Sequence, residues 1–370
     1  MNEHGPQIQT NVSGAQRPRI RYFDIVRGLA ILMVILSHSI LTAGVVAPQG
    51  VAAMWTFNLC FSFHMPLFFV LSGYFMRPER SFRWAKESRE LIGTYAITAA
   101  VVVIGAAALA WIRHVGGRQV LFSWLSAAIY GAGDIAPHAL WPQTARIGAI
   151  WFLLALFWAH LLMHLLVRLP LTPVWVAVCF AVGYASARWI WLPFDIQSGM
   201  CALLFVYAGY LARRHDALRW MNAHPAVWVV PAIIWGLAIW KFSGFSLAMN
   251  QYGATPVLAA FGGFAGTACM VGISMLVDRW TGPIATGLAK VGQVSLALLC
   301  AHLIDDNLFP WVPLLARLHD AVPAVPLWIA LFLLRLVLDA LLASVLWCLP
   351  KVSVWFYPMK AKRRQAPAQA

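Results

Sequence analysis

The sequence predicts an all-α polytopic membrane protein with about ten transmembrane helices, and its composition and apolar runs carry that prediction. Of the 370 residues, 61% are hydrophobic and only 11% are charged, whereas a soluble domain has about 45–50% apolar and about 25% charged residues. A soluble chain of this composition would lack the polar side chains needed to cover its surface. The apolar residues also form runs of roughly 20, which is the length at which a helix crosses a hydrocarbon core of about 30 Å.

Ten such runs follow one another along the chain. The weakest are 196–212 and 284–304, the second because it contains Lys290 and Gln293. A further apolar piece, 120–132, is too short to span and is expected to be a re-entrant or interfacial helix. We expect transmembrane helices over residues 25–47, 52–76, 91–112, 148–167, 173–191, 196–212, 224–242, 256–277, 284–304 and 325–348.

The distribution of Lys and Arg predicts the orientation of these helices. With the N-terminus in the cytoplasm, the cytoplasmic segments contain 19 Lys or Arg residues and the far-side loops contain five. The positive-inside rule expects such a bias, and an even number of spans places both termini in the cytoplasm. The formal net charge of +14 is therefore mostly cytoplasmic loop charge. That charge attracts anionic membrane lipids and does not require a nucleic-acid partner.

The chain is expected to hold one membrane domain between two short tails. Residues 1–20 are polar and are predicted to be a disordered cytoplasmic tail. Residues 21–350 form the transmembrane domain, and residues 351–370 form a basic cytoplasmic tail. No convincing cleavable signal sequence is found. All six Cys residues fall inside predicted spans, and no Cys or His spacing indicates a ligand set, so neither a disulfide framework nor a metal is expected.

The first span contains two ionisable residues on one face. An ionisable residue costs of order 3 kcal/mol at the centre of a membrane helix and is by default a functional hypothesis. Arg27 and His38 are eleven residues apart, which is three helical turns plus roughly 20° and about 16 Å of rise. They therefore share one stripe with Asp24. Alternatively, the arginine extends to the membrane interface and a neighbouring helix satisfies the histidine.

The second span and the segment after it add a polar motif and a basic motif. His64 lies within the span two residues before Pro66, which frees a backbone carbonyl that must be satisfied internally. Ser72-Gly73 permits the close approach of another helix. Arg77 and Arg80 follow three residues apart and hence on one helical face, where two guanidiniums could grip one phosphate group. Basic residues beside a span are also ordinary topology signals.

Two further positions have both a functional and a simpler interpretation. His302 lies near the far end of the ninth span, with Asp305 and Asp306 beside it. This gives either a base–carboxylate pair or a polar helix end. Trp151 opens the fourth span and, taken alone, indicates only core packing.

Two other pairs of polar residues inside spans are expected to be structural. His160 and His164 are four residues apart, but the sequence offers no facing ligands for a metal. Arg335 and Asp339 are also four residues apart, in the last span, and are expected to neutralise each other.

Together these motifs resemble the acyltransferase 3 family of integral-membrane O-acyltransferases, and within it the fucose 4-O-acetylase type that modifies bacterial glycans. The segment RYFDIVRGLAILMVILSH contains an Arg, ten residues and a His, and FSFHMPLFFVLSGYFM precedes the RxxR of Arg77 and Arg80. Trp151-Phe152-Leu153 resembles a WFL of the family. GQVSLALLCAHL resembles its late Ser…His segment and places His302.

The resemblance implies a donor, an acceptor and a location. The donor is acyl-coenzyme A, most simply acetyl-CoA. The acceptor is a carbohydrate hydroxyl of a cell-surface or exported glycan, or of a lipid-linked sugar. The location is the bacterial cytoplasmic (inner) membrane. Arg77 and Arg80, with Arg89 as a further candidate, are expected to bind the donor's phosphates.

The same comparison assigns expected roles within the membrane. His38, with Arg27 and Asp24, is the expected catalytic group. Its imidazole would act either as a general base on the attacking hydroxyl or as the acyl carrier. The residues expected to contact substrate or to be structural are His64, Ser72, Trp151 and His302.

A transporter or flippase for a glycan or lipid-linked sugar is the main alternative, with Arg27 and His38 as substrate-binding or proton-relay groups. No pair of Gly- or Pro-broken spans at corresponding positions marks two repeats, which argues against it. A non-catalytic membrane scaffold would leave the aligned arginine and histidine unexplained. The sequence therefore favours a membrane O-acyltransferase.

Overall fold

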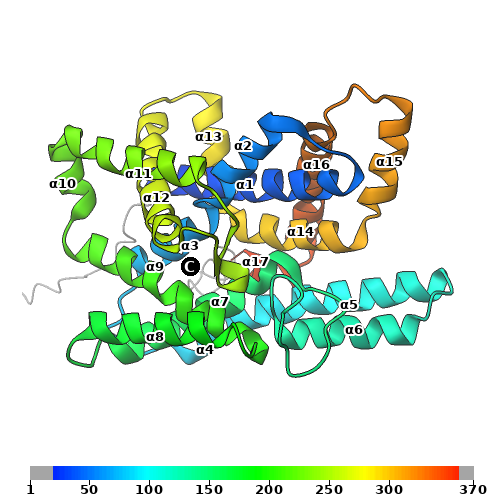
Figure 1. Cartoon of the computed structure of the whole chain (residues 1–370), viewed down its shortest axis with the longest axis horizontal. Coiled ribbons are helices and arrows are strands. Elements are labelled where there is room, and N and C mark those ends of the chain that lie inside the picture. Colours follow the sequence, from blue (N-terminus) through cyan, green and yellow to red (C-terminus); the bar gives the residue numbers. More distant parts are fainter. Residues whose placement is uncertain (1–19, 358–370) are drawn as a thin grey trace, which may run out of the picture.

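The computed structural model describes residues 20–357, which form an almost entirely helical bundle (Figure 1). Residues 1–19 of the tail predicted for residues 1–20, and residues 358–370 of the basic tail, lie outside the described residues. The first part of that second tail forms a short helix, α17 (Ser353–Phe356). The Trp355 ring of α17 would collide with any side chain added at Gly93, so the C-terminal segment packs directly against the third predicted span.

Seven helices or stacked helices in the described part of the chain are long and apolar enough to cross a membrane. Four of them contain more than one element. Helix α2 (Gly50–Phe61) is followed directly by α3 (His64–Phe75), and η1 (Ser88–Gly93) joins α4 (Trp84–Glu87) to α5 (Thr94–Ile112). The short turns η2 (Gly148–Ile150) and η3 (Pro193–Asp195) precede the other two. The seven are α1 (Arg21–Val46), α2–α3, α4–α5, η2–α7 (α7, Trp151–Leu166), η3–α9 (α9, Ile196–Arg214), α12 (Pro256–Asp278) and α16 (Leu327–Cys348).

Two further helix pairs are apolar enough to span but are sharply bent. The pair α10 (Ala217–Ala223) and η4–α11 (Pro225–Trp228 and Val229–Trp240) bends by 112°. The pair α13 (Pro283–Gln293) and α14 (Ser295–Leu308) bends by 73°. Counting each bent pair as one span raises the number from seven to nine.

The predicted all-α polytopic class is confirmed, and nine of the ten predicted runs coincide with one of these helices or pairs. The remaining run, 173–191, is occupied by α8 (Thr172–Ser186), which has only 15 residues. Ten membrane crossings therefore remain a prediction. The remaining elements are α6 (Gly117–Tyr130), α15 (Trp311–Ala321), a small antiparallel hairpin of β1 (Phe245–Ser246) and β2 (Gln251–Tyr252), and the turn η5 (Leu247–Met249) between its strands.

Glycines set the closest helix contacts. A Cβ on Gly73 of α3 would lie 1.9 Å from the Val206 carbonyl oxygen of α9, and a Cβ on Gly209 of α9 would lie 1.9 Å from the Val70 carbonyl oxygen of α3. Only hydrogen atoms fit at both positions, so the two backbones pack directly against each other. This contact confirms the close approach that Ser72-Gly73 predicts.

The last membrane helix, α16, has a buried face that contains two charged residues and an exposed face that is apolar. Residues spaced by four lie on one face of a helix. The face of α16 that turns into the bundle contains Leu331, Arg335, Asp339 and Ala343, all buried, whereas the face that turns outward contains Leu333, Val337 and Leu341, each more than half exposed. This division is expected of a helix whose outer face contacts lipid.

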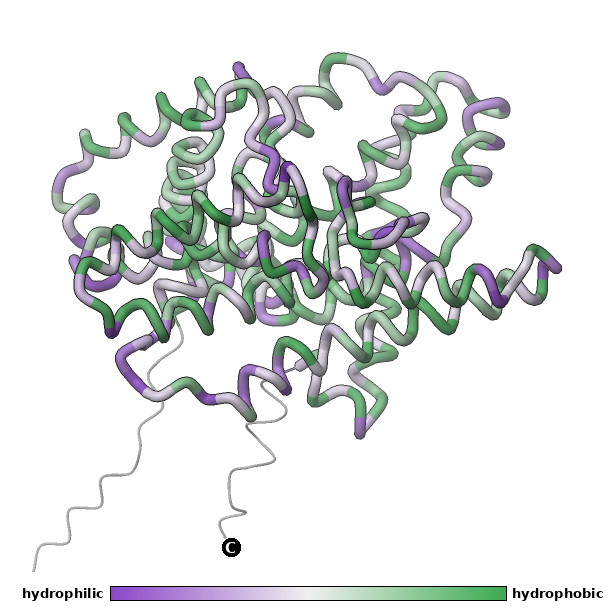
Figure 2. Tube along the Cα trace, turned by 60° about the horizontal axis from the view of Figure 1, so that its bottom comes forward, coloured by the Kyte–Doolittle hydropathy of each residue, from purple (hydrophilic) through white to green (hydrophobic). Residues whose placement is uncertain are grey.

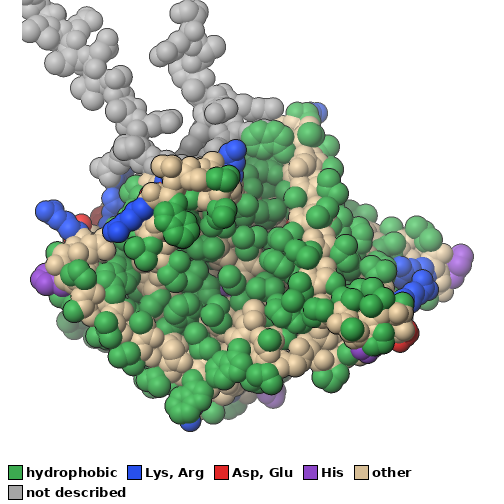
Figure 3. All heavy atoms as spheres, turned by 90° about the horizontal axis from the view of Figure 1, so that it is seen from above, with side chains coloured by type: hydrophobic (Ala, Val, Ile, Leu, Met, Phe, Trp, Pro, Cys, Tyr) green, Lys and Arg blue, Asp and Glu red, His purple; other side chains and the backbone are tan. Residues whose placement is uncertain are grey.

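Polar residues gather at the helix ends, and apolar residues cover the outside. In Figure 2 the hydrophobic segments follow the helices and the hydrophilic ones lie mainly in loops. The face shown in Figure 3 is largely hydrophobic, with Lys and Arg side chains towards its margins. At one end of the bundle, the start of α1 contacts the end of α12 through an ion pair of 3.4 Å between Arg21 and Asp278. At the other end, Gln49 follows α1, and its Oε1 accepts a hydrogen bond from the Trp328 N–H at the start of α16.

Candidate functional site

Helix α1 holds the arginine and the first acidic residue of the candidate site at one end. The Arg27 guanidinium lies 3.7 Å from the carboxylate of Asp24, which is buried. Asp24 also accepts a hydrogen bond of 3.3 Å from the amide of Gln293, the last residue of α13. This contact is possible because Gly292 has no side chain, since a Cβ there would overlap the Asp24 carbonyl oxygen.

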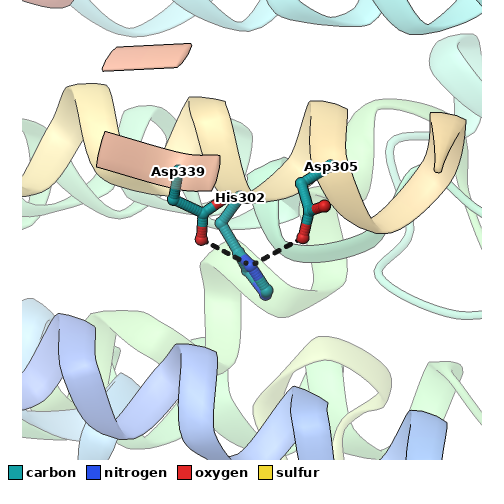
Figure 4. Close-up of side chains that lie close together, drawn as sticks. All are labelled: His302, Asp305 and Asp339. Carbon is teal, nitrogen blue, oxygen red and sulfur yellow. Dashed lines mark hydrogen bonds and ion pairs between the residues drawn. The ribbon is translucent and has the colours of Figure 1, made fainter. Parts of the chain in front are cut away.

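His38 lies towards the other end of α1 and begins a chain of hydrogen bonds. Its Nδ1 is 3.2 Å from Nε2 of His302 on α14. The other ring nitrogen of His302 is 3.2 Å from Oδ2 of Asp339 on α16. His302 and Asp339 are fully buried. Three helices far apart in the sequence thus place two imidazoles and a carboxylate in one row, and Figure 4 shows His302 between Asp339 and Asp305.

With Asp339 ionised, this row of hydrogen bonds sets which nitrogen of His38 carries the proton. An ionised Asp339 accepts a hydrogen bond from Nδ1–H of His302, so Nε2 of His302 has to accept one from Nδ1–H of His38. Nε2 of His38 then keeps its lone pair. A neutral imidazole with a free lone pair is the form that removes a proton from a hydroxyl.

Arg335 has different partners from the one the sequence predicts. Its guanidinium lies 3.2 Å from Asp305 and 2.6 Å from Asp306, both on α14. Asp339 pairs with His302 instead, so the expected neutralisation of Arg335 by Asp339 is wrong. The long arginine side chain reaches across to two carboxylates on the facing helix, which compensate its buried charge better than one residue on its own helix.

His302 likewise has a different main partner. Asp305 is 3.9 Å from its Nδ1, farther than Asp339 at 3.2 Å. Asp306 turns to Arg335, and also lies 3.7 Å from Arg146. His302 is therefore part of a base–carboxylate pair, but the carboxylate comes from α16.

The group His302, Asp305 and Asp339 is the one cluster in residues 20–357 whose ligand atoms could surround a metal, since all lie within 4.8 Å of one another. Arg335 already places a guanidinium 3.2 Å from Asp305. A fixed cation at that distance compensates the carboxylates and repels a second cation. The cluster is better described as a buried ion-pair network that supports His302.

Helix α1 contributes residues to two cavities of the described chain. The histidine cavity, of about 120 Å³, is lined by His38, His64, Trp151, Asp134, Arg146 and residues of the β1 hairpin. The arginine cavity, of about 630 Å³, is lined by the cationic residues Arg27, Arg77, Arg80, Arg83, Lys86 and Arg213 together with Ser72, Glu87, His160 and His164. It lies at the end of the bundle that the charge distribution predicts to be cytoplasmic.

The same three helices line both cavities. Helix α1 places Arg27 in the arginine cavity and His38 in the histidine cavity, and α3 and α7 each contribute one residue or more to both. The pairs span eight to eleven residues, or about 12 to 16 Å of helix rise. The two cavities are therefore stacked along the same helices.

The structure brings most of the predicted site residues to these cavities. His38, His64 and Trp151 line one, and Arg27, Ser72, Arg77 and Arg80 line the other. Arg77 and Arg80 lie in the turn after α3, so the prediction that they share one helical face is wrong. The exception among the arginines is Arg89, which is exposed and lines neither cavity.

A carboxylate lies near the arginine cavity, in the loop after α3. The Tyr210 hydroxyl donates a hydrogen bond of 2.7 Å to Glu79. Desolvation opposes ionisation of Glu79, but this hydrogen bond and the nearby Arg214 lower its pKa below the ordinary value. Glu79 is therefore ionised at neutral pH and partly offsets the positive charge of this end of the protein.

A comparison with protein families identifies the family of this chain. Residues 20–346 match the acyltransferase 3 family, whose match is described as an acyltransferase domain. The chain belongs to the acyltransferase 3 family. It is therefore a membrane-embedded O-acyltransferase, as the sequence motifs predict.

Two curated relatives are similar to this acyltransferase 3 protein over most of their length. The Nodulation protein NolL of Mesorhizobium japonicum is 23% identical over 328 residues, which cover 83% of this chain and 79% of the relative. The Nodulation protein NolL of Sinorhizobium fredii is 24% identical over 336 residues, covering 83% and 80%. No solved structure matches the chain.

Sequence reasoning missed several residues at this acyltransferase site. The spacing on α16 suggests Arg335 as the partner of Asp339, and no sequence pattern singles out Arg146 or Glu87. His160 is expected to be structural, and in the structure its Nε2 lies 2.6 Å from the Ser72 hydroxyl and its Nδ1 lies 2.9 Å from Glu87. The available signal was a histidine inside an apolar span, which by itself does not name its partners.

Proposed function

We propose that the protein transfers an acyl group, most simply acetyl, from cytosolic acyl-CoA to a carbohydrate hydroxyl of a glycan or lipid-linked sugar. The observation that carries the proposal is the placement of Arg27 and His38 on one helix, each in its own cavity. The arrangement offers a charged site for the donor's anionic end and a basic nitrogen for the acceptor's hydroxyl. A bacterial inner membrane is the location this proposal implies.

The composition of the arginine cavity supports binding of the donor's phosphates there. Six Lys or Arg side chains line it, and guanidiniums bind phosphate oxygens as planar, bidentate donors. Arg77 and Arg80 follow directly after α3 and both line the cavity. Arg89 is not assigned to the donor in this proposal because it lines neither cavity.

The hydrogen-bond chain of His38 supports a role as general base. The acceptor hydroxyl gives its proton to Nε2 of His38 while its oxygen attacks the carbonyl carbon of the thioester. The carbon–sulfur bond then breaks, and the thiolate takes the proton back from the imidazolium. Asp339 stabilises that imidazolium through His302, in the way that a carboxylate orients a catalytic histidine.

The experiment is an acyl-transfer assay in membranes that contain the full chain. Membranes are incubated with acetyl-CoA labelled in the acetyl group, and carbohydrate is separated and counted. We expect label on carbohydrate only where the chain is present. A correctly inserted protein that binds CoA but transfers no label to carbohydrate would contradict the proposed acceptor class.

A further inference from the structure

Three polar side chains form a second hydrogen-bond chain at the wall of the arginine cavity. Ser72 on α3 lies 2.6 Å from Nε2 of His160 on α7. Nδ1 of His160 lies 2.9 Å from the Glu87 carboxylate at the end of α4. All three residues line the cavity, and the side chains of His160 and Glu87 are only 13% and 14% exposed.

Among the residues of α3 and α7 that line the arginine cavity, Ser72 and His160 are the closest in sequence to the residues of the same helices that line the histidine cavity. Helix α3 runs from His64 in the histidine cavity to Ser72, and only then to the arginines that follow it. Helix α7 runs from Trp151 in the histidine cavity to His160. The rise between the two cavities is about 12 to 14 Å along either helix.

A donor that bridges the two cavities along α3 and α7 passes the level of this pair. In the proposed function, the phosphates bind at Arg77 and Arg80 and the thioester reaches His38. The part between them is the pantetheine arm of CoA, an uncharged chain with two amide groups. An amide that leaves water without a hydrogen-bond partner costs several kcal/mol, roughly 2–7 depending on the reference state. Amides at this level therefore need polar partners on the protein.

We propose that Ser72, held by His160 and Glu87, binds an amide group of the donor's pantetheine arm and so selects pantetheine-type thioesters. This inference rests on the proposed function. Glu87 accepts a hydrogen bond from Nδ1–H of His160, so Nε2 of His160 accepts one from the Ser72 hydroxyl. The Ser72 oxygen then has lone pairs left for an amide N–H, and it is a better acceptor because its own proton is donated.

The same three residues also match the order of a nucleophile, its base and an orienting acid. An acyl-serine at Ser72 would, however, leave the acyl group about 12 Å along α3 from His64 and the cavity that holds His38. A two-carbon acyl group cannot cover that distance. The position therefore favours binding of the arm over covalent catalysis.

The experiment measures binding of two ligands to the full chain in detergent or lipid nanodiscs. CoA carries the pantetheine arm, and adenosine 3′,5′-bisphosphate carries phosphates without the arm. We expect Ser72→Ala to weaken CoA binding about two- to tenfold, the effect of one hydrogen bond, and to leave bisphosphate binding unchanged. His160→Gln should weaken CoA alone in the same direction, and Ser72→Thr should retain CoA binding.

Ser274→Ala is the matched control, because Ser274 is a buried serine of α12 that bonds its own helix and lines neither cavity. Equal CoA binding by Ser72→Ala and wild type would overturn the inference. So would an equal loss of both ligands, which indicates a structural role, or an acetyl group found covalently on Ser72 after incubation with acetyl-CoA.

The two proposals fail in different ways. A wild-type protein that binds neither ligand has a donor other than CoA, which overturns both. A wild-type protein that binds CoA in a Ser72-dependent manner but acylates no carbohydrate overturns the proposed function and leaves the arm-binding site standing.

Discussion

At the scale of single residues, the site depends on contacts that the sequence only partly predicts. The alignment of Arg27 with His38 follows from helical geometry alone, because both are on one helix. The pairing of His302 with Asp339 does not, because it joins residues 37 apart on two helices. The i, i+4 rule therefore assigned Asp339 to Arg335, its neighbour on the same helix, instead of to His302.

Asp339 is expected to orient His38 through His302 without contacting substrate. Asp339→Asn keeps the shape but can present an N–H to His302, which disturbs the protonation of both imidazoles. We expect the kcat for acyl transfer to fall by about 10²- to 10⁴-fold with little change in the KM for acyl-CoA. Asp320→Asn, on the exposed surface of α15, is the control. An unchanged kcat in a folded Asp339→Asn protein would show that the carboxylate is purely structural.

The arginines can be separated from their topology role by replacing them with lysine. Lysine preserves the positive charge but lacks the planar fork that grips two phosphate oxygens. Arg77→Lys/Arg80→Lys should therefore retain expression and orientation while raising the apparent KM for acyl-CoA. S-Acetylpantetheine, which lacks the nucleotide end, should be used almost equally by mutant and wild type.

Arg89→Lys provides the matched control for the arginine pair, because Arg89 is exposed and outside both cavities. Its KM should equal that of the wild type. A double-lysine variant that matches wild type with full-length donor would make Arg77 and Arg80 topology signals only.

At the scale of helices, the bent pair α13–α14 explains why the run 284–304 is one of the two weakest predicted spans. Its polar residue Gln293 lies at the break between the helices, where it reaches Asp24. The two helices meet at 73°, and both contact α1. Composition indicates that such a run is unusual, but the angle is a property of the tertiary contacts.

Close helix packing predicts a strong effect of a single methyl group. Gly73→Ala places a Cβ about 1.9 Å from the Val206 carbonyl oxygen, so α3 and α9 have to separate. We expect a loss of stability of about 1–3 kcal/mol, typical of overpacking, measured as a lower midpoint of thermal unfolding in detergent. Gly236→Ala on α11 is the control, because a Cβ there meets nothing within 4 Å. Equal unfolding midpoints would mean that the two helices are not in direct backbone contact.

At the scale of the whole molecule, the charge distribution and the cavities predict one orientation. The arginine cavity lies at the end that contains Arg21, Arg77 and Arg213. Which helices meet at each cavity was beyond sequence reasoning, because this depends on how α1, α3 and α7 associate. Their apolar character was predictable from their residues, and their neighbours were not.

Reporter fusions test this orientation directly. Fusions near Lys86, Arg219 and the C-terminus should report a cytoplasmic location. Fusions near Pro48, Gln251 and Leu318 should report the far side, since 19 of the Lys and Arg residues lie in the segments predicted to be cytoplasmic. A cytoplasmic result at Gln251 would break the ten-span topology and would move the histidine cavity to the wrong side.

The most direct test of the central claim is the acyl-transfer rate of His38→Ala, measured together with its affinity for CoA. The imidazole lies in the histidine cavity, about 16 Å along α1 from Arg27 in the arginine cavity. Its removal should therefore lower acyl transfer from labelled acetyl-CoA to carbohydrate by about 10²- to 10⁴-fold and leave CoA binding unchanged. Normal transfer by a correctly inserted His38→Ala protein would contradict the account.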